Sequence, residues 1–225
     1  YALDAIKNGA KFSVVDDMSL EGKHKSLIYV EDVLDTLQKL AIFHRDSLEI
    51  PVIGLTGSNG KTTTKDLLDH VLSANMKTVS TKGNFNSTIG VPLSIFECNG
   101  NEDVAIIEMG ASMPGEIEYI CNIVQPNMGI ITNIYEAHLE YFGDINEVAK
   151  TKSSLFSSIE KEGVAFINMD DPFISKMPIA CKGVEYSFNN SSDYQGSWSS
   201  DRQTLTINNI LINFPISFQK IHNSF

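Results

Sequence analysis

Short apolar runs alternate with amphipathic stretches through the middle of this 225-residue chain. Such alternation is typical of a parallel sheet with helices on its faces, and the runs are apolar almost throughout, as buried parallel strands are. We therefore predict an α/β fold built on a mostly parallel, doubly wound sheet. The expected strands are residues 51–56, 77–81, 103–109, 128–134 and 163–169, and the expected helices are 62–74, 115–124 and 145–161.

The segments that flank this block differ from it. Residues 25–48 indicate a short strand and then a helix, with Glu31 and Asp32 in its first turn and His44 and Arg45 in its last, which suits the helix dipole. Beyond about residue 185 the chain becomes polar and then alternates in "TLTINNILINF". That alternation predicts a small antiparallel hairpin added to the sheet.

Composition excludes several classes of protein. The net charge of -11, with only 17 Lys and Arg, argues against a nucleic-acid partner. Cys98, Cys121 and Cys181 form no CxxC pair, and we interpret them as reduced core thiols. No apolar run approaches the ~18 residues that would span a bilayer, and the N-terminus lacks a signal-peptide pattern, so we expect a cytoplasmic protein with no membrane insertion.

The stretch "TGSNGKTT" follows an apolar run and precedes an amphipathic helix, which is the setting of a phosphate-binding loop. Gly57 and Gly60 would let the backbone approach a nucleoside triphosphate. Lys61 would reach its β- and γ-phosphates, and the Thr62 hydroxyl would coordinate Mg²⁺. Leu55 stands where the usual loop has its first glycine, so the loop is a variant, and a glycine-rich turn capping a helix is the alternative. The remaining expected ATP-binding residues of the loop are Thr56, Ser58, Asn59 and Thr63.

Two polar residues follow other expected strands, where doubly wound sheets bind ligands. Glu108 ends the run "VAIIE", so a magnesium role suits it, and a helix-capping or solvated glutamate is the alternative. His138 lies shortly after the strand "GIITNI". It is either a ligand at this sheet edge or a hydrogen-bonded structural residue.

Lys152 lies on the apolar face of the expected helix 145–161, whereas Lys150 points elsewhere. An inward lysine is costly unless it is paired or its pKa falls. A lowered pKa would supply the neutral amine that carbon dioxide carbamylates, which turns a cation into an oxygen ligand for Mg²⁺. A buried salt bridge and a side chain that extends its tip into water are the alternatives. The apolar face comprises Ile145, Val148, Ala149, Leu155, Phe156 and Ile159.

Together these motifs resemble the Mur ligase family, the ATP-dependent amide-forming enzymes of peptidoglycan synthesis, and their relatives the folylpolyglutamate synthases. The shortened phosphate loop "TGSNGKTT" matches the family pattern. The segments 82–96, 108–117, 131–143 and 148–156 are most similar to members that join D-alanyl-D-alanine to a UDP-N-acetylmuramoyl tripeptide. The resemblance implies a ligase of cell-wall biogenesis, and so of cell shape and division, that uses ATP and Mg²⁺, and we expect a monomer.

The resemblance also implies roles for individual residues. Lys61 would bind phosphate, and Thr62, Glu108, His138 and a carbamylated Lys152 would hold Mg²⁺. Lys61, His138 and Lys152 are the expected catalytic residues. On the substrate side the resemblance places Asn84 and Asn86. The segments "NMDD" and "HN" resemble nucleotide-adjacent motifs and contribute Asn168, Asp170, Asp171, His222 and Asn223, of which Asn168, Asp171 and Asn223 are expected to bind ATP.

The resemblance divides the chain into domains. Residues 1–48 would end an N-terminal UDP-substrate-binding domain, and 49–225 would form the central ATP-binding domain. The first residue, Tyr, and the end at "QKIHNSF" indicate a fragment. The resemblance implies that it lacks the start of the UDP-substrate-binding domain, the last helix of the ATPase domain and the C-terminal domain, so we expect it to be inactive.

Competing functions remain open at this point. One is another ligase of the family, such as the enzyme that adds the third residue, or a folylpolyglutamate synthase. Another is a P-loop nucleotide switch, which the absence of an NKxD guanine motif disfavours.

Overall fold

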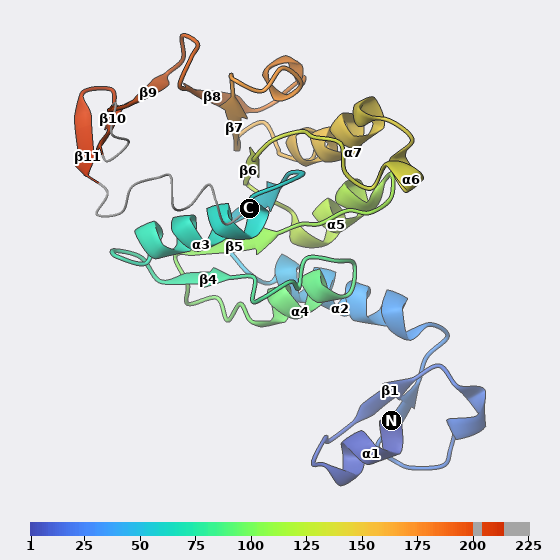
Figure 1. Ribbon diagram of the computed structural model, residues 1–225. Coiled ribbons are helices and arrows are strands. Elements are labelled where there is room, and N and C mark those ends of the chain that lie inside the picture. Colours follow the sequence, from blue (N-terminus) through green and yellow to red (C-terminus); the bar gives the residue numbers. More distant parts are fainter. Residues whose placement is uncertain (200–203, 214–225) are drawn as a thin grey trace.

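A computed structural model describes residues 1–199 and 204–213 (Figure 1). The N-terminal part contains α1 (Ala2–Lys7), β1 (Ser13–Val15), the 3₁₀ helix η1 (Met18–Leu20), β2 (Leu27–Tyr29) and α2 (Val33–Asp46). The middle contains β3 (Val52–Thr56), α3 (Lys61–Leu72), β4 (Thr78–Ser80), α4 (Gly90–Phe96), β5 (Val104–Glu108), α5 (Glu116–Val124), β6 (Met128–Ile131), α6 (Leu139–Phe142), α7 (Ile145–Ser157) and β7 (Val164–Asn168). The last part contains the 3₁₀ helix η2 (Ile174–Lys176), β8 (Lys182–Ser187), β9 (Tyr194–Trp198), β10 (Thr204–Ile207) and β11 (Ile210–Asn213).

The main sheet has nine strands in the order β4-β5-β3-β6-β7-β8-β9-β10-β11. Each pairing from β4 to β9 is parallel, and β9-β10-β11 pair antiparallel. The predicted α/β class, the doubly wound sheet and the C-terminal hairpin are thereby confirmed. Chain order reverses at β3, which lies between β5 and β6, and ligands of such sheets bind beyond the carboxyl ends of the strands at this point.

Apolar side chains of the central strands alternate between two cores. Val52 and Ala105 belong to a large core covered by α2, α4, α5 and α7. Ile53 and Ile106 face the other way, into a small core beneath α3. Figure 1 shows α2 and α4 on the opposite side of the sheet from α3. Helices therefore cover both faces of the sheet, but unequally.

Helix α2 joins the N-terminal strands β1 and β2 to the main sheet (Figure 1). Asp32 caps its start by accepting a hydrogen bond from Asp35 N. At its end the buried Arg45 donates to the carbonyls of Val124, Leu48 and Gln125, which fixes the helix against α5. The domain division at residue 48 stays a prediction.

Several elements differ from the sequence-based expectations. Helix α4 was not predicted because Gly90 and Pro92 disfavour a helix, although proline is tolerated in a first turn. Helix α6 is one turn long, too short for a periodic pattern, and β8 was also missed. The strand expected over 128–134 ends at Ile131, and its last polar residues form a loop.

Three minor predictions have mixed outcomes. Cys98 and Cys121 are buried free thiols whose pKa values burial raises to about 11 and about 12, whereas Cys181 is free but half-buried. His222 and Asn223 lie outside the described residues. None of the helices within the described ranges has the length and apolar character needed to cross a membrane.

Candidate functional site

The phosphate loop spans residues 56–63 between β3 and α3. Gly57 has φ +148°, and a Cβ there would lie 1.8 Å from Thr132 Oγ1. Gly60 has φ +75° in the left-handed region and directly precedes α3. Both positions favour glycine, and the first N–H groups of α3, which is the kind of helix start that binds phosphate, follow directly after Gly60. The Thr56 side chain is buried and donates to Met109 O at 2.8 Å, which anchors the loop on the β5 side.

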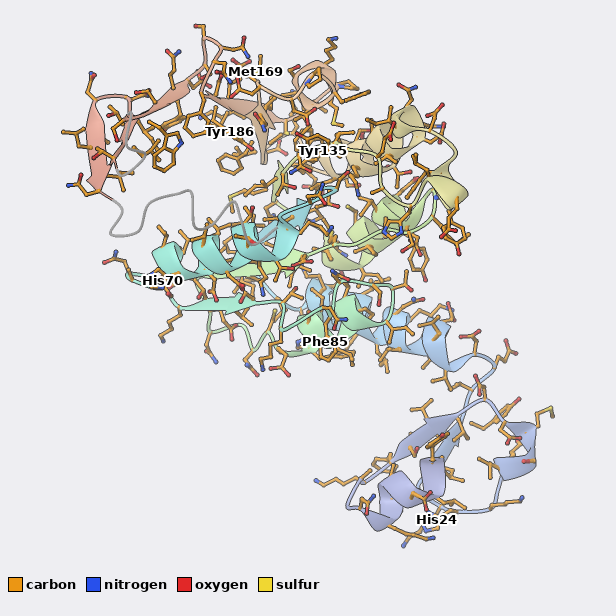
Figure 2. The ribbon with its side chains drawn as sticks, in the orientation of Figure 1. His24, His70, Phe85, Tyr135, Met169 and Tyr186 are labelled. Atoms are coloured by element: carbon orange, nitrogen blue, oxygen red, sulfur yellow. The ribbon has the colours of Figure 1, made fainter. Side chains whose placement is uncertain are left out.

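Residues that follow β6 hold the other side of the loop. Asn59 N donates to Asn133 Oδ1 at 3.0 Å, and Asn59 O accepts from Thr132 Oγ1 at 2.7 Å. Ser58 Oγ donates to Tyr135 O at 2.9 Å. Tyr135 is labelled in Figure 2. Sequence reasoning missed this arrangement. The one sequence feature that could have indicated these contacts is the run of polar residues after the apolar strand β6, at the same sheet edge as the phosphate loop.

Lys61 lies at the first turn of α3 and folds back over the loop. Its Nζ donates to Gly57 O at 2.9 Å and Ser58 O at 3.4 Å. Burial lowers its pKa, and the nearby carboxylate of Glu108 acts in the opposite direction. Of the other loop hydroxyls, Thr62 is exposed and Thr63 half-buried.

Glu108 ends β5 and is almost fully buried, which contradicts a solvated glutamate. Its Oε1 accepts from Asn86 Nδ2 at 2.7 Å, whereas its Oε2 is buried with no hydrogen-bond partner. An unpartnered buried carboxylate oxygen is costly and is suited to a cation. The predicted Glu108 and the substrate-side Asn86 are thus brought together.

Lys152 is 3% exposed on the inward face of α7, as its position in the apolar stripe predicted. Its side chain forms no ion pair or hydrogen bond within the described residues, which contradicts a buried salt bridge there, whereas the alternative with the side-chain tip in water stays open. Burial, and next the positive charge of Lys61, lower its pKa from 10.5 to about 8. Lys150, by contrast, is exposed and pairs with Glu147.

The buried amine makes a testable contribution to stability. The pKa of Lys152 is lowered in the folded state, so the cost of its charge is full below about pH 8 and disappears as pH rises to 10.5. Lys152→Met should therefore raise the free energy of unfolding at pH 7 by about 3 kcal/mol. This gain in the free energy of unfolding should shrink as the pH rises from about 8 to 10.5. Chemical denaturation at a series of pH values, in buffer free of bicarbonate, measures it. A gain that does not vary with pH would contradict this account.

His138 differs from Glu108 and Lys152 in being exposed. It precedes α6 in the left-handed conformation, with φ 51°, which is uncommon for a residue other than glycine, and its side chain is exposed. Across residues 1–199 and 204–213, no three His, Cys, Asp or Glu side chains gather in a group that could hold a metal. His138 therefore does not meet Glu108 in such a group, and its metal role stays a prediction.

The remaining predicted residues occupy two places. Asn84 is exposed in the loop before Asn86. The buried Asp171 accepts from the backbone N–H groups of Ile134, Phe173 and Ile174, so it fixes the loop after β6 to β7 and η2. Asn168 Nδ2 donates to Thr132 O at 3.4 Å. Both therefore support the segment that holds the phosphate loop, and their predicted contact with ATP is untested.

Known proteins match most of the length of this chain. The Mur ligase middle domain matches residues 55–223. UDP-N-acetylmuramoyl-tripeptide–D-alanyl-D-alanine ligase of Bacillus subtilis (strain 168) is 35% identical over 204 residues, which cover 89% of this chain and 44% of that protein. The same-named protein of Rickettsia prowazekii (strain Madrid E) is 33% identical over 196 residues, with 85% and 44% covered. The chain thus spans less than half the length of these relatives.

Two solved structures share the fold. MurF from Acinetobacter baumannii has a TM-score of 0.82 and 30% identity, and the match covers 95% of this chain and 47% of that one. MurF ligase from Thermotoga maritima in complex with ADP has a TM-score of 0.80 and 29% identity, with 93% and 50% covered.

Proposed function

Because the chain belongs to the Mur ligase family, we propose that the protein of which it is part joins D-alanyl-D-alanine to a UDP-N-acetylmuramoyl tripeptide in an ATP-dependent step of peptidoglycan synthesis. One observation carries the proposal: a phosphate loop, a buried carboxylate with an unpartnered oxygen and a buried unpaired lysine meet at one sheet edge. The names of the similar curated proteins support the substrates. We further propose that the enzyme is a monomer in the cytoplasm and that its N-terminal domain ends at residue 48.

The residues of the loop suit attack by a carboxylate on ATP. An oxygen of the tripeptide carboxylate attacks the γ-phosphorus, and the bond to ADP breaks, which gives an acyl phosphate. The amine of D-alanyl-D-alanine then attacks the acyl carbon, loses a proton, and inorganic phosphate leaves. Two anions approach in the first step, so the ammonium of Lys61 and the N–H groups at the start of α3 stabilise the developing charge.

The same edge fits Mg²⁺. The unpartnered Glu108 Oε2 is a hard oxygen donor, and Thr62, His138 and a carbamylated Lys152 would complete the set of ligands. When bound, Mg²⁺ neutralises charge on the phosphate oxygens. Asn86 contributes from the protein side, since its amide holds the other oxygen of Glu108 and so orients the carboxylate.

The surroundings of Lys152 support its carbamylation. The amine is buried and free of hydrogen bonds within the described residues, and with a pKa of about 8, about one molecule in ten carries it neutral at pH 7. Its nitrogen attacks the carbon of CO₂, an N–C bond forms, one C–O π pair moves to oxygen, and a proton leaves to solvent. The product is an anion, which the neighbouring Lys61 stabilises.

The choice of amine tests the proposed substrate. Full-length protein should release phosphate from ATP with the UDP-muramoyl tripeptide and D-alanyl-D-alanine, and at most about a hundredth as fast when a single amino acid replaces the dipeptide. The measurement is phosphate release across a panel of amines, with ligated product identified by mass spectrometry. Preference for glutamate on a folate, or for a third amino acid on a muramoyl dipeptide, would assign a different ligase of the family.

A further inference from the structure

We propose that Lys65 is a positioning residue that fixes the substrate-side loop, residues 81–86, relative to the phosphate loop. The inference rests on the proposed ligase reaction and assigns a function to a buried lysine that the proposed mechanism does not use. Lys65 lies one turn after Lys61 on α3, and it is the buried residue of that helix. Its side chain therefore starts from the element that carries the phosphate-binding lysine.

The first contact joins α3 to the loop. Lys65 is 4% exposed, and its Nζ donates to Thr81 O at 2.7 Å. Its second partner is the neighbouring Asp66, whose Oδ1 lies 2.8 Å away but whose side chain is 65% exposed. Burial of an ammonium costs free energy unless the ammonium donates hydrogen bonds. The Thr81 carbonyl is therefore held within hydrogen-bond distance of Lys65 Nζ.

The second contact joins the loop to Glu108. The buried Thr81 uses its hydroxyl to accept from Glu108 N at 3.0 Å. At the far end of the loop, Asn86 Nδ2 donates to Glu108 Oε1, and Gly110 N donates to Asn86 O at 2.7 Å. Displacement of Thr81 would therefore move both the carboxylate and the amide that orients it.

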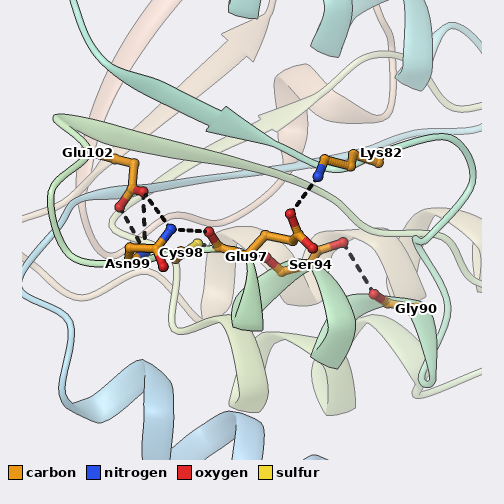
Figure 3. A network of polar contacts seen from close by, with 7 residues as sticks. All are labelled: Lys82, Gly90, Ser94, Glu97, Cys98, Asn99 and Glu102. Atoms are coloured by element: carbon orange, nitrogen blue, oxygen red, sulfur yellow. Dashed lines mark hydrogen bonds and ion pairs between the residues drawn. The ribbon is translucent and has the colours of Figure 1, made fainter. Parts of the chain in front are cut away.

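The loop is also held by β5, because Thr81 N donates to Ile106 O at 3.0 Å, and by α4 together with Glu97, which follows it. Figure 3 shows the pair of Lys82 and Glu97. Lys82 pairs with Glu97 at 2.5 Å on the surface, and Ser94 Oγ donates to Phe85 O at 3.2 Å. A Cβ on Gly90 would lie 2.5 Å from Phe85 Cα, so helix and loop are in close contact. These contacts hold the loop to α4, and within the described residues the hydrogen bond of Lys65 is the one from an α3 side chain to this loop. Loss of Lys65 should thus leave ATP binding intact while loosening the loop.

Steady-state kinetics of the full-length protein test the proposal. Lys65→Met keeps the length of the side chain and removes the ammonium. We expect the KM for ATP to change by less than about 3-fold, while kcat/KM for the muramoyl tripeptide falls about 10- to 100-fold. Lys65→Arg, which still donates, should recover most of that loss. Lys150→Met, which removes an exposed lysine paired with Glu147, should leave all constants unchanged.

Hydrogen exchange gives a readout that does not depend on activity. In Lys65→Met, the amides of Glu108 and Gly110 should exchange about 10-fold faster than in the parent protein, while those of β7 keep their rates. Unchanged exchange at these two amides would overturn the positioning role, even if the parent protein showed no ligase activity and the proposed function had failed separately. Equal losses toward ATP and peptide, without recovery in Lys65→Arg, would also overturn it.

A second variant covers the case in which Lys65→Met does not fold. Thr81→Ala keeps the carbonyl that Lys65 holds and removes the hydroxyl that receives the Glu108 amide hydrogen. It should reproduce the selective loss of kcat/KM for the muramoyl tripeptide. Parent-like kinetics in Thr81→Ala would show that the link from Lys65 to Glu108 does not serve the reaction.

Discussion

Lys61→Ala in the full-length protein should lower kcat for ATP-dependent phosphate release by about 10²- to 10³-fold. The reason is the position of its ammonium, 2.9 Å from Gly57 O at the concave side of the phosphate loop, where no other described lysine donates to a loop carbonyl. Removal of the side chain leaves the loop N–H groups in place, so binding of ATP should weaken less than turnover. Phosphate release and calorimetric ATP binding measure the two effects.

Lys150→Ala is the control for that experiment, because its exposed ammonium pairs only with Glu147 among the described residues and lies outside the site. It should keep the parent rate. Unchanged ATP affinity together with unchanged turnover in Lys61→Ala would remove Lys61 from the proposed mechanism.

Lys152→Ala should abolish ligation, with a loss of at least about 10³-fold in kcat. The reason is that the carbamate would be a buried anionic ligand, which a water molecule replaces poorly. A short-chain carboxylate added to the assay should restore part of the activity, since the truncated side chain leaves room for an oxygen ligand of similar charge. Activity is followed as ligated product against carboxylate concentration.

The matched comparison for Lys152→Ala is again Lys150→Ala, two residues away on the same helix but on its exposed face. Carboxylate should have no effect on this control. Full activity of Lys152→Ala, or stimulation of both variants to the same degree, would refute the carbamate role.

Much of this site was predictable because its signals are local. The glycines, the lysine and the hydroxyls of residues 56–63 are consecutive in sequence, and the strand and helix around them follow from apolar periodicity. The burial of Lys152 followed from the register of one helical stripe. Glu108 was placed at the sheet edge because it ends an apolar run of the expected length.

The contacts that support the site were not predictable, because they join residues far apart in sequence. Asn133 holds Asn59 across 74 positions, and Arg45 reaches Val124 across 79. No local pattern marks such partners. Asp171 shows the same limit: its carboxylate accepts from three backbone N–H groups, which no sequence motif indicated, and its expected contact with ATP stays a prediction.

The close approach of Gly57 to Thr132 also sets how the loop tolerates substitution. A side chain at position 57 would collide with the end of β6 whether or not ATP is bound, so variants there lose abundance as well as activity. At position 61 the side chain is half-buried and extends over the loop, so variants should remain abundant and lose activity alone. Two adjacent parts of one motif are therefore under different selective constraints, one on the folded protein and the other on its chemistry.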